Sequence, residues 1–366
     1  MIARGSFLQA SAAGLVALAA SPGAARAASG DAKLIRVASS STFMLNGIAV
    51  APNGRMFASC PRWTDSPSPN VAELMPDGSI RGYPNDYWLD WQPGKSTEDR
   101  FVSVHSLHAD ADNRLWVVDD AVARQAPQVK ARPKLVQIDL ATNAVVHTFV
   151  FDEMAAPPGA NFGHVRAQGR YAYVSDSKGG ALIVLDRTTG RARRLLEGNP
   201  AVQADHSIQP LIDGIPFRQK SGAPIDVAID LLEISGPYLY FTCLFGPALW
   251  RIPLSALQDD ALAPVALAAQ LERVIDIPPC AGLMVDKRGT FYLSAFSQNA
   301  ILRLRPGGKL ETIVTDPRVS FPNEGTVGPD GYLYFPASQI QRIPANQPDG
   351  VSRVKLPFEV LKIDVR

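Results

Sequence analysis

Six positions along the sequence carry polar side chains suited to ligand binding or proton transfer. They are Asn46, His105, His164, Asp226, Asn323 and Glu324. A neutral imidazole at His105 or His164 would serve as a general base, with Asp226 or Glu324 orienting it. The same two carboxylates would pair with a cationic amine. The alternative role of all six side chains is to line a water-filled channel, where polar groups need no special function.

A repeated phrase follows these positions and indicates what holds them. It consists of a turn containing Gly, Asn or Pro and then a run of apolar and aromatic residues. The copies occupy residues 52–59, 111–119, 168–176, 235–243, 287–295 and 329–337. They recur about every fifty residues, which is the spacing of β-propeller blades. The sequence therefore predicts an all-β fold, a six-bladed β-propeller with four-stranded antiparallel blades around a central channel.

The fifth repeat shows the expected four strands most clearly. They cover residues 281–286, 290–296, 300–308 and 310–316, separated by polar turns. Residues 34–40 and 358–365 also have the pattern of strands. We expect one or both to complete the last blade, which would close the ring and remove exposed sheet edges.

The six polar positions stand at the start of the innermost strand of their blades. The alignment places Asn46 before residues 47–50, His105 before 106–110 and Asp226 before 227–230. Five loops would thus deliver these six side chains to one channel mouth, since Asn323 and Glu324 share a loop, and the remaining inner strand opens with Ala281. The aromatic residue of each repeated phrase is expected to pack between blades. The long connector of residues 199–221 should form a loop over one face.

The tryptophans and cysteines leave alternatives open. The segment from Tyr87 to Trp91 is apolar enough to be a lid or a partner-binding patch. Cys243 and Cys280 form the more plausible disulfide among three cysteines, and three buried thiols are an equal alternative. Cys280 with converging histidines would suit zinc or copper, but no Cys-x-x-Cys or His-x-His spacing supports such a site. His105 and His108, three apart, should point to opposite faces of a strand.

Composition and the N-terminus bound the class of protein. The chain has 366 residues, 46% hydrophobic and 19% charged, with a net charge of +1, so no nucleic-acid partner is expected. Residues 1–27 have the pattern of a cleaved signal peptide, with a twin-arginine-like start in which Gly5 replaces the second arginine. We expect a secreted or periplasmic monomer, without a membrane anchor after cleavage, in which residues 28–366 form a single domain.

Several segments together resemble the bacterial branch of the major royal jelly protein/yellow family. They are GIAVAPNGRMFAS, ADADNRLWVVDD, LVQIDLATNAVV, YVSDSKGGALIVLD, NAILRLRPGGKLETIVTDPR and GPDGYLYFPASQIQRIP. The resemblance extends over essentially the whole chain after residue 27. It implies a secreted six-bladed propeller with a ligand tunnel along its axis. Some insect members bind biogenic amines, and yellow-type members are tied to pigment metabolism.

The fold is also similar to the gluconolactonase-like, calcium-dependent hydrolases. That resemblance implies a Ca²⁺ held by Glu, Asn and Asp oxygens at the channel mouth. This sequence has Gly163-His164 and Ala281-Gly282 where such relatives often have oxygen ligands. We therefore expect no cofactor, with Ca²⁺ held by Asp226, Asn323 and Glu324 as the alternative.

Three functional hypotheses follow. The first is an exported propeller that binds a small organic ligand, such as an amine or an aromatic metabolite, in its channel. Phe245 or Phe296 would add a cation–π contact. The second is an enzyme, a lactonase-type ester hydrolase or a tautomerase/isomerase, with His105 or His164 as base. The third is a protein-interaction scaffold that uses the tryptophan-rich segment.

Overall fold

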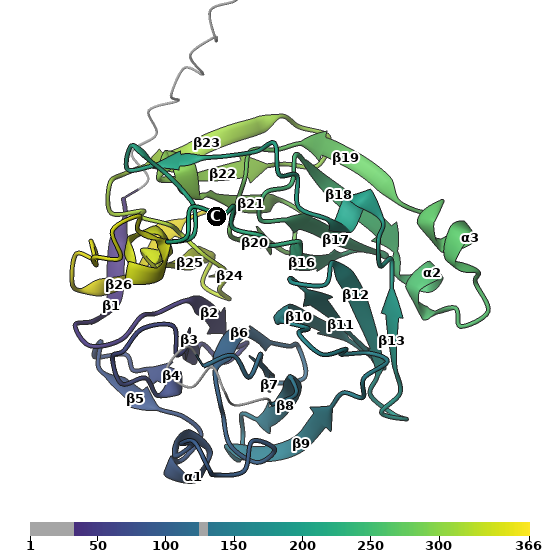
Figure 1. Cartoon of the computed structure of the whole chain (residues 1–366), viewed down its shortest axis with the longest axis horizontal. Coiled ribbons are helices and arrows are strands. Elements are labelled where there is room, and N and C mark those ends of the chain that lie inside the picture. The colour runs from purple at the N-terminus through teal and green to yellow at the C-terminus, as the bar shows by residue number, and fades with distance from the viewer. Residues whose placement is uncertain (1–32, 124–130) are drawn as a thin grey trace, which may run out of the picture.

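A computed structural model describes residues 33–123 and 131–366. Within these residues the chain forms six four-stranded antiparallel sheets, arranged around a central axis as the blades of a propeller (Figure 1). The predicted fold class is therefore confirmed. The predicted signal peptide, residues 1–27, lies outside the described residues. None of the described helices is long and apolar enough to cross a lipid bilayer.

The first three blades follow one another along the chain. Blade 1 consists of β2 (Gly47–Val50), β3 (Met56–Cys60), β4 (Asn70–Leu74) and β5 (Ile80–Gly82). Blade 2 consists of β6 (Val104–Ala109), β7 (Arg114–Asp119), β8 (Lys134–Asp139) and β9 (Ala144–Val150). Blade 3 consists of β10 (Phe162–Gln168), β11 (Tyr171–Asp176), β12 (Ala181–Asp186) and β13 (Ala192–Leu195).

The other three blades repeat the same strand order from the axis outward. Blade 4 consists of β16 (Ile229–Ser235), β17 (Tyr238–Cys243), β18 (Ala248–Pro253) and β19 (Glu272–Asp276). Blade 5 consists of β20 (Leu283–Val285), β21 (Phe291–Ala295), β22 (Ala300–Leu304) and β23 (Leu310–Thr315). Blade 6 consists of β24 (Thr326–Val327), β25 (Tyr332–Ala337), β26 (Phe358–Asp364) and β1 (Ile35–Ser40).

Short elements occupy the connections. The helices are α1 (Asp86–Leu89), α2 (Leu254–Gln258) and α3 (Pro264–Ala268). The 3-10 turns are η1 (Pro200–Val202), η2 (Phe296–Gln298), η3 (Ile340–Arg342) and η4 (Pro344–Asn346). The connector between blades 3 and 4 contains a small hairpin of β14 (Leu211–Ile212) and β15 (Ile215–Pro216).

The ring closes by pairing the two ends of the described chain. β1 is the outer strand of blade 6 and runs antiparallel to β26, with Ile35 opposite Lys362 and Ser40 opposite Phe358. In Figure 1 the purple strand β1 lies beside the yellow strand β26. Both terminal segments predicted to close the ring therefore do so. The closure pairs an edge that would otherwise be exposed.

The aromatic residues of the repeated phrases pack between blades, as predicted. Phe57 and Trp116 are fully buried, and Phe57 contacts Tyr83 at a ring distance of 4.8 Å. Tyr240 of blade 4 lies 4.6 Å from Phe291 of blade 5. These side chains fill the wedge between neighbouring sheets, and their burial stabilises each blade against the next.

The structure decides between the alternatives left open for the tryptophans and cysteines. Trp88 and Trp91 are only 9% and 1% exposed, so neither tryptophan is available to a partner, whereas Tyr87 is 52% exposed. The segment folds back because Trp88 packs against Phe101 in the core of blades 1 and 2. The Cys243–Cys280 disulfide is not formed: Cys60, Cys243 and Cys280 are free and buried. Burial raises the pKa of the Cys280 thiol to about 12, which keeps it protonated.

In blades 1 and 3 a serine on the second strand ties the inner strand to the next blade. Ser175 on β11 accepts a hydrogen bond from the His164 N–H at 2.8 Å and donates to the carbonyl of Asp230 at 2.7 Å. Ser59 on β3 makes the equivalent bonds, from the Gly47 N–H at 2.9 Å and to the carbonyl of His105 at 2.8 Å. These small buried hydroxyls fix the spacing between adjacent inner strands at the channel.

We predict that Ser175→Ala lowers the free energy of unfolding by about 1–3 kcal/mol, because it leaves two buried backbone groups without a partner. Chemical denaturation measures the change. Ser221→Ala, in the exposed part of the connector, is the matched control and should stay within about 0.5 kcal/mol of the wild type. Equal effects of the two substitutions would show that the serine link is dispensable.

Candidate functional site

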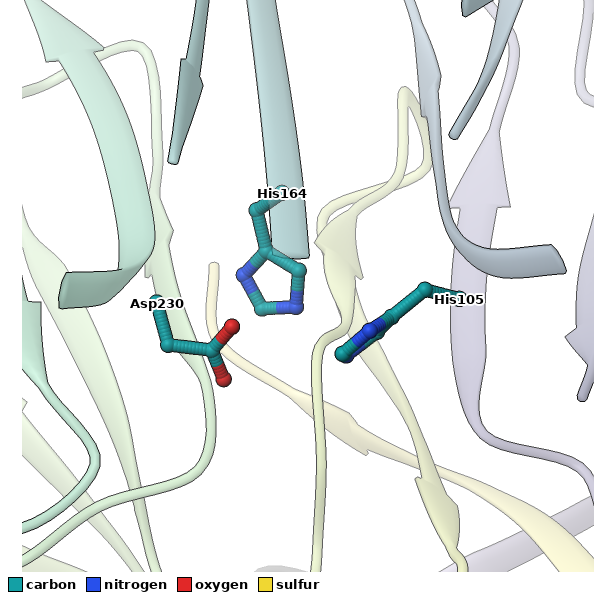
Figure 2. Close-up of side chains that lie close together, drawn as sticks. All are labelled: His105, His164 and Asp230. Carbon is teal, nitrogen blue, oxygen red and sulfur yellow. The ribbon is translucent and has the colours of Figure 1, made fainter. Parts of the chain in front are cut away.

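Three side chains from adjacent inner strands meet at the axis. His105 on β6, His164 on β10 and Asp230 on β16 present ligand atoms that all lie within 4.8 Å of one another. Figure 2 shows the three side chains pointing toward one another from three different blades. His164 and Asp230 are 1% and 6% exposed, and His105 is partly exposed.

A β-bulge near the start of each of these three inner strands directs the side chains. The pairing register shifts between Val104 and Ser106, between Phe162 and Val165, and between Ile229 and Leu231. His105, His164 and Asp230 lie within these shifts. An extra residue in one strand of a pair turns its side chain away from the regular alternation. Three blades thus use the same local distortion to direct a polar group to the channel.

Asp230, and not Asp226, is the blade 4 residue equivalent to His105. The sequence alignment was wrong because it started the inner strand too early, whereas β16 begins at Ile229. Asp226 lies at the rim of the site, where its half-exposed carboxylate pairs with Lys178 at 3.0 Å and lies 3.7 Å from His206. The repeated bulge, which only the structure reveals, identifies Asp230 as the equivalent residue.

Carboxylates stand behind both histidines. Asp120 Oδ2 lies 3.6 Å from Nδ1 of His105, and Glu324 Oε2 lies 3.5 Å from Nε2 of His164. The sequence did not single out Asp120, because its partner His105 lies on another strand. Its neighbour Asp119 points the other way and pairs with the buried Lys134 at 2.6 Å, so Asp120 faces the channel.

Arg166 on β10 links the site to two other blades. Its guanidinium donates to Glu324 Oε1 at 2.7 Å and to Glu233 Oε2 at 2.8 Å. Arg166 and Glu324 are 4% and 2% exposed in their side chains. This arginine was not predicted, although it lies shortly after His164 on the same strand.

The environment separates the two histidines electrostatically. Burial opposes protonation of His105, but Asp120, Asp230 and Glu324 outweigh it and raise the pKa of His105. Burial, His105 and Arg166 hold the pKa of His164 well below its usual range. His164 is therefore the neutral imidazole of the pair.

Burial also acts on the carboxylates. It raises the pKa of Asp120 and of Asp230, with His105 opposing the shift in both cases. Burial raises the pKa of Glu324 to about 7, although Arg166 opposes the shift. Such perturbed groups gathered in one pocket are typical of functional sites.

The two predicted asparagines position the site, because hydrogen bonds within the protein already use some of their side-chain atoms. Asn323 donates to Asn46 Oδ1 at 2.7 Å, and Asn46 donates to the carbonyl of His105 at 3.0 Å. Asn323 Oδ1 accepts from the N–H of Glu324 at 2.9 Å. The two amides therefore connect blades 6, 1 and 2 around the axis.

The three residues named as alternative Ca²⁺ ligands already have partners. The side-chain oxygens of Asn46 and Asn323 accept hydrogen bonds, and one oxygen of Glu324 is held by Arg166. Asp226 pairs with Lys178 at the rim. Ca²⁺ binding by Asp226, Asn323 and Glu324 stays a prediction, and it would compete with these contacts.

A cavity of about 220 Å³ opens above the histidines. Its lining includes the polar groups His105, Asp230 and Asn323 and the apolar side chains Trp63 and Phe321. The predicted cover from the connector is confirmed, because Phe217 also lines this cavity. All six predicted site residues therefore lie in or directly around one site. His105, Asp226 and Asn323 line the cavity, with Asp226 at its rim.

Four phenylalanines form the apolar side of the site. Phe296 stacks on Phe321 at 4.7 Å, and Phe217 and Phe245 pack against them in one buried cluster. Phe245 and Phe296 were candidates for contact with a ligand. Both are buried, and neither lines the cavity above the histidines, so they support the wall from behind.

We predict that Arg166→Gln lowers the free energy of unfolding by about 3–5 kcal/mol, because it leaves the buried carboxylate of Glu324 and the partly buried carboxylate of Glu233 without their cation. Thermal and chemical unfolding measure the loss. Arg170→Gln removes an exposed arginine from its pair with Asp186 and should leave the unfolding midpoint unchanged. A stable Arg166→Gln protein would contradict the bridging role.

Comparisons with solved structures find the same architecture at low sequence identity. A streptogramin B lyase is 11% identical, with a TM-score of 0.53 over 91% of this chain and 97% of that chain. A virginiamycin B lyase from Staphylococcus aureus is 12% identical, with a TM-score of 0.51 over 90% and 98%. A putative oxidoreductase (glucose dehydrogenase) from Thermus thermophilus is 14% identical, with a TM-score of 0.53 over 90% and 99%. These likenesses show the fold alone.

The sequence itself gives the family. No curated protein matches the chain in sequence. The family model described as major royal jelly protein matches residues 102–354. This match covers more than half of the chain and includes His105, His164, Asp230 and Glu324. The chain therefore belongs to the major royal jelly protein family.

Proposed function

We propose that the protein binds a small, ring-bearing organic molecule in the cavity at the mouth of its central channel. The observation that carries the proposal is the division of this cavity into an apolar wall and a buried polar base. Ligand sites in proteins have this combination, in which apolar surface supplies affinity and a few polar groups fix orientation.

The apolar wall suits a flat ring. Trp63 meets the His105 ring edge-on at 5.1 Å, and Phe321 is held flat against Phe296. Both rings are fixed by packing before a ligand enters, which lowers the entropic cost of binding. The cavity volume of about 220 Å³ is below the ~300–1,000 Å³ of sites for drug-sized ligands. The ligand is therefore of metabolite size.

The polar base favours a ligand with a cationic group. Asp120, Asp230, Glu324 and Glu233 are the carboxylates around the base, and Arg166 is the permanent cation among them. A protonated amine would approach Asp230 while its ring lies against Trp63 or Phe321. The insect members of the family that bind biogenic amines support the choice of an amine as ligand.

A second candidate function is enzymatic, with His105 as general base. The observation that favours it is the Asp120 carboxylate behind Nδ1 of His105, which would orient the ring and stabilise its protonated form. An isomerase or a lactonase-type hydrolase would use this pair. The fold neighbours include lyases, but at 11–12% identity their activity is not transferred.

The scaffold hypothesis has lost the feature that motivated it, because Trp88 and Trp91 are buried.

Export to the periplasm or the medium remains part of the proposal, on the pattern of residues 1–27. Detection of a processed chain beginning near residue 28 in a periplasmic fraction would test it. An unprocessed chain in the cytoplasm would contradict it.

We predict that tryptamine binds the wild-type protein and that Trp63→Leu weakens its affinity at least tenfold, because the ring loses its stacking surface. Isothermal titration calorimetry measures both. Trp250→Leu, which removes a half-buried tryptophan on β18 outside this cavity, is the matched control and should bind as the wild type does. Equal affinities of the Trp63 and Trp250 variants would refute the proposed wall.

The same titration separates binding from catalysis. If the protein only binds, the ligand should be recovered unchanged by mass spectrometry after prolonged incubation. If it is an enzyme, candidate esters, lactones or tautomers should turn over, and His105→Asn should abolish turnover while retaining binding to the Trp63 wall.

A further inference from the structure

The three side chains at the base of the cavity form a set of donors with no assigned ligand. Two imidazoles and one carboxylate converge from three blades, with their donor atoms within 4.8 Å of one another. We propose that His105, His164 and Asp230 bind a divalent transition-metal ion of the zinc class. The metal would share Asp230 with the amine orientation proposed above, so the metal is tested in the absence of any organic ligand.

The geometry needs only a small contraction to bind an ion. Zinc bonds to histidine nitrogen and carboxylate oxygen are about 2.0–2.2 Å long, so tetrahedral ligands lie about 3.4 Å apart. Shifts of about 1 Å, shared among three side chains, bring the present separations into this range. All three residues lie at bulges, where the backbone already directs them inward.

Buried polar atoms without partners surround the same point. His164 Nε2, Asp230 Oδ1, Glu324 Oε2, His105 Nδ1 and Asp120 Oδ2 have no hydrogen-bond partner within the described residues. Native proteins rarely bury such atoms unsatisfied, because each costs free energy. His105 Nδ1 and Asp120 Oδ2 face each other at 3.6 Å, whereas Asp230 Oδ1 and His164 Nε2 are left for a further ligand. An ion bound to His164 and Asp230 would give these two atoms a partner.

Charge in the site supports a cation. Arg166 serves Glu324 and Glu233, whereas Asp120 and Asp230 have only the histidines beside them. Bringing this many carboxylates together in a poorly solvated site is unfavourable unless positive charge offsets them. A divalent ion between Asp230 and the histidines would supply that charge.

Second-layer contacts match those of metal-binding histidines. A ligating histidine usually holds its other ring nitrogen against a carboxylate, which fixes the ring and raises its basicity. Asp120 faces Nδ1 of His105 in this way, so Nε2 is the nitrogen left for the ion. Glu324, fixed by Arg166, supplies a further oxygen beside His164.

Gly163 keeps the site open. A Cβ atom at this position would fall 2.1 Å from Asp230 Oδ1 and 2.9 Å from Ser175 Oγ. Any larger residue would displace the carboxylate from the triangle. Glycine next to His164 is therefore the residue that allows Asp230 to approach both histidines.

The donor set selects the class of metal. Two imidazoles with one carboxylate suit zinc and neighbouring first-row ions, whereas calcium requires six to eight oxygens. Three protein ligands leave one position of a tetrahedral ion for water or a ligand atom. His105 is partly exposed to the cavity, so this position would be reached from there.

The test is a Zn²⁺ titration of tag-free full-length protein after removal of metals with EDTA. We expect one tight equivalent by calorimetry and one zinc atom per chain by elemental analysis. Asp230→Asn and His164→Gln should weaken Zn²⁺ affinity by about 100-fold or more. Asp120→Asn, which acts through His105, should weaken it by about 10–100-fold. Co²⁺ substituted for zinc should show the visible absorption of nitrogen-bound cobalt in the wild type only.

Two controls exclude other sites. His147→Gln removes a histidine on the outer strand β9, and Asp226→Asn removes the rim carboxylate beside His206; both should bind Zn²⁺ as the wild type does. Zn²⁺ should also raise the unfolding temperature of the wild type but not of Asp230→Asn. Retained affinity in Asp230→Asn with a native circular dichroism spectrum, or loss in Asp226→Asn, would overturn the proposal. Tryptamine binding, measured separately, decides the proposed function.

Discussion

The buried bridge through Arg166 is the interaction on which the arrangement of the site depends. Its guanidinium binds Glu324, which precedes β24 in blade 6, and Glu233 on β16 in blade 4. Arg166 itself belongs to blade 3, so one side chain connects three blades across the axis. Desolvating these charges is costly, and only mutual hydrogen bonding offsets the cost. The bridge thereby fixes Glu324 beside His164, and the surrounding asparagines and serines extend that order to the neighbouring inner strands.

The periodic part of the fold could be predicted from the sequence, and the local distortions could not. Turn residues and aromatic positions repeat because every blade packs against its neighbours in the same way. The blades and the closure of the ring could therefore be predicted from the sequence. His105, His164 and Glu324 were found because they open inner strands. Asp230 was missed because a bulge, which has no clear sequence signature, sets its direction. Asp120 and Arg166 were missed because their partners come from other strands and blades.

The side chains at its mouth determine what a propeller can bind. Here two histidines and one carboxylate converge at the axis. Hydrogen bonds join Asn46, Asn323 and Glu324 and position them around these three groups. The same scaffold thus carries a site of different chemistry, which is why fold likeness to lyases or dehydrogenases does not define the activity.

The charge at the base of the cavity links the two proposals. Without a metal ion, the carboxylates at the base outnumber the permanent cation Arg166. The resulting negative electrostatic potential favours a protonated amine as ligand. With a divalent ion bound to His105, His164 and Asp230, Asp230 is already paired and the excess negative charge is largely cancelled. The field would then favour a ligand that offers a neutral or anionic oxygen to the ion. The ring-binding wall of Trp63 and Phe321 is unaffected by this change. If both proposals hold, metal occupancy would determine the polar half of the ligand, and the apolar wall would determine its shape.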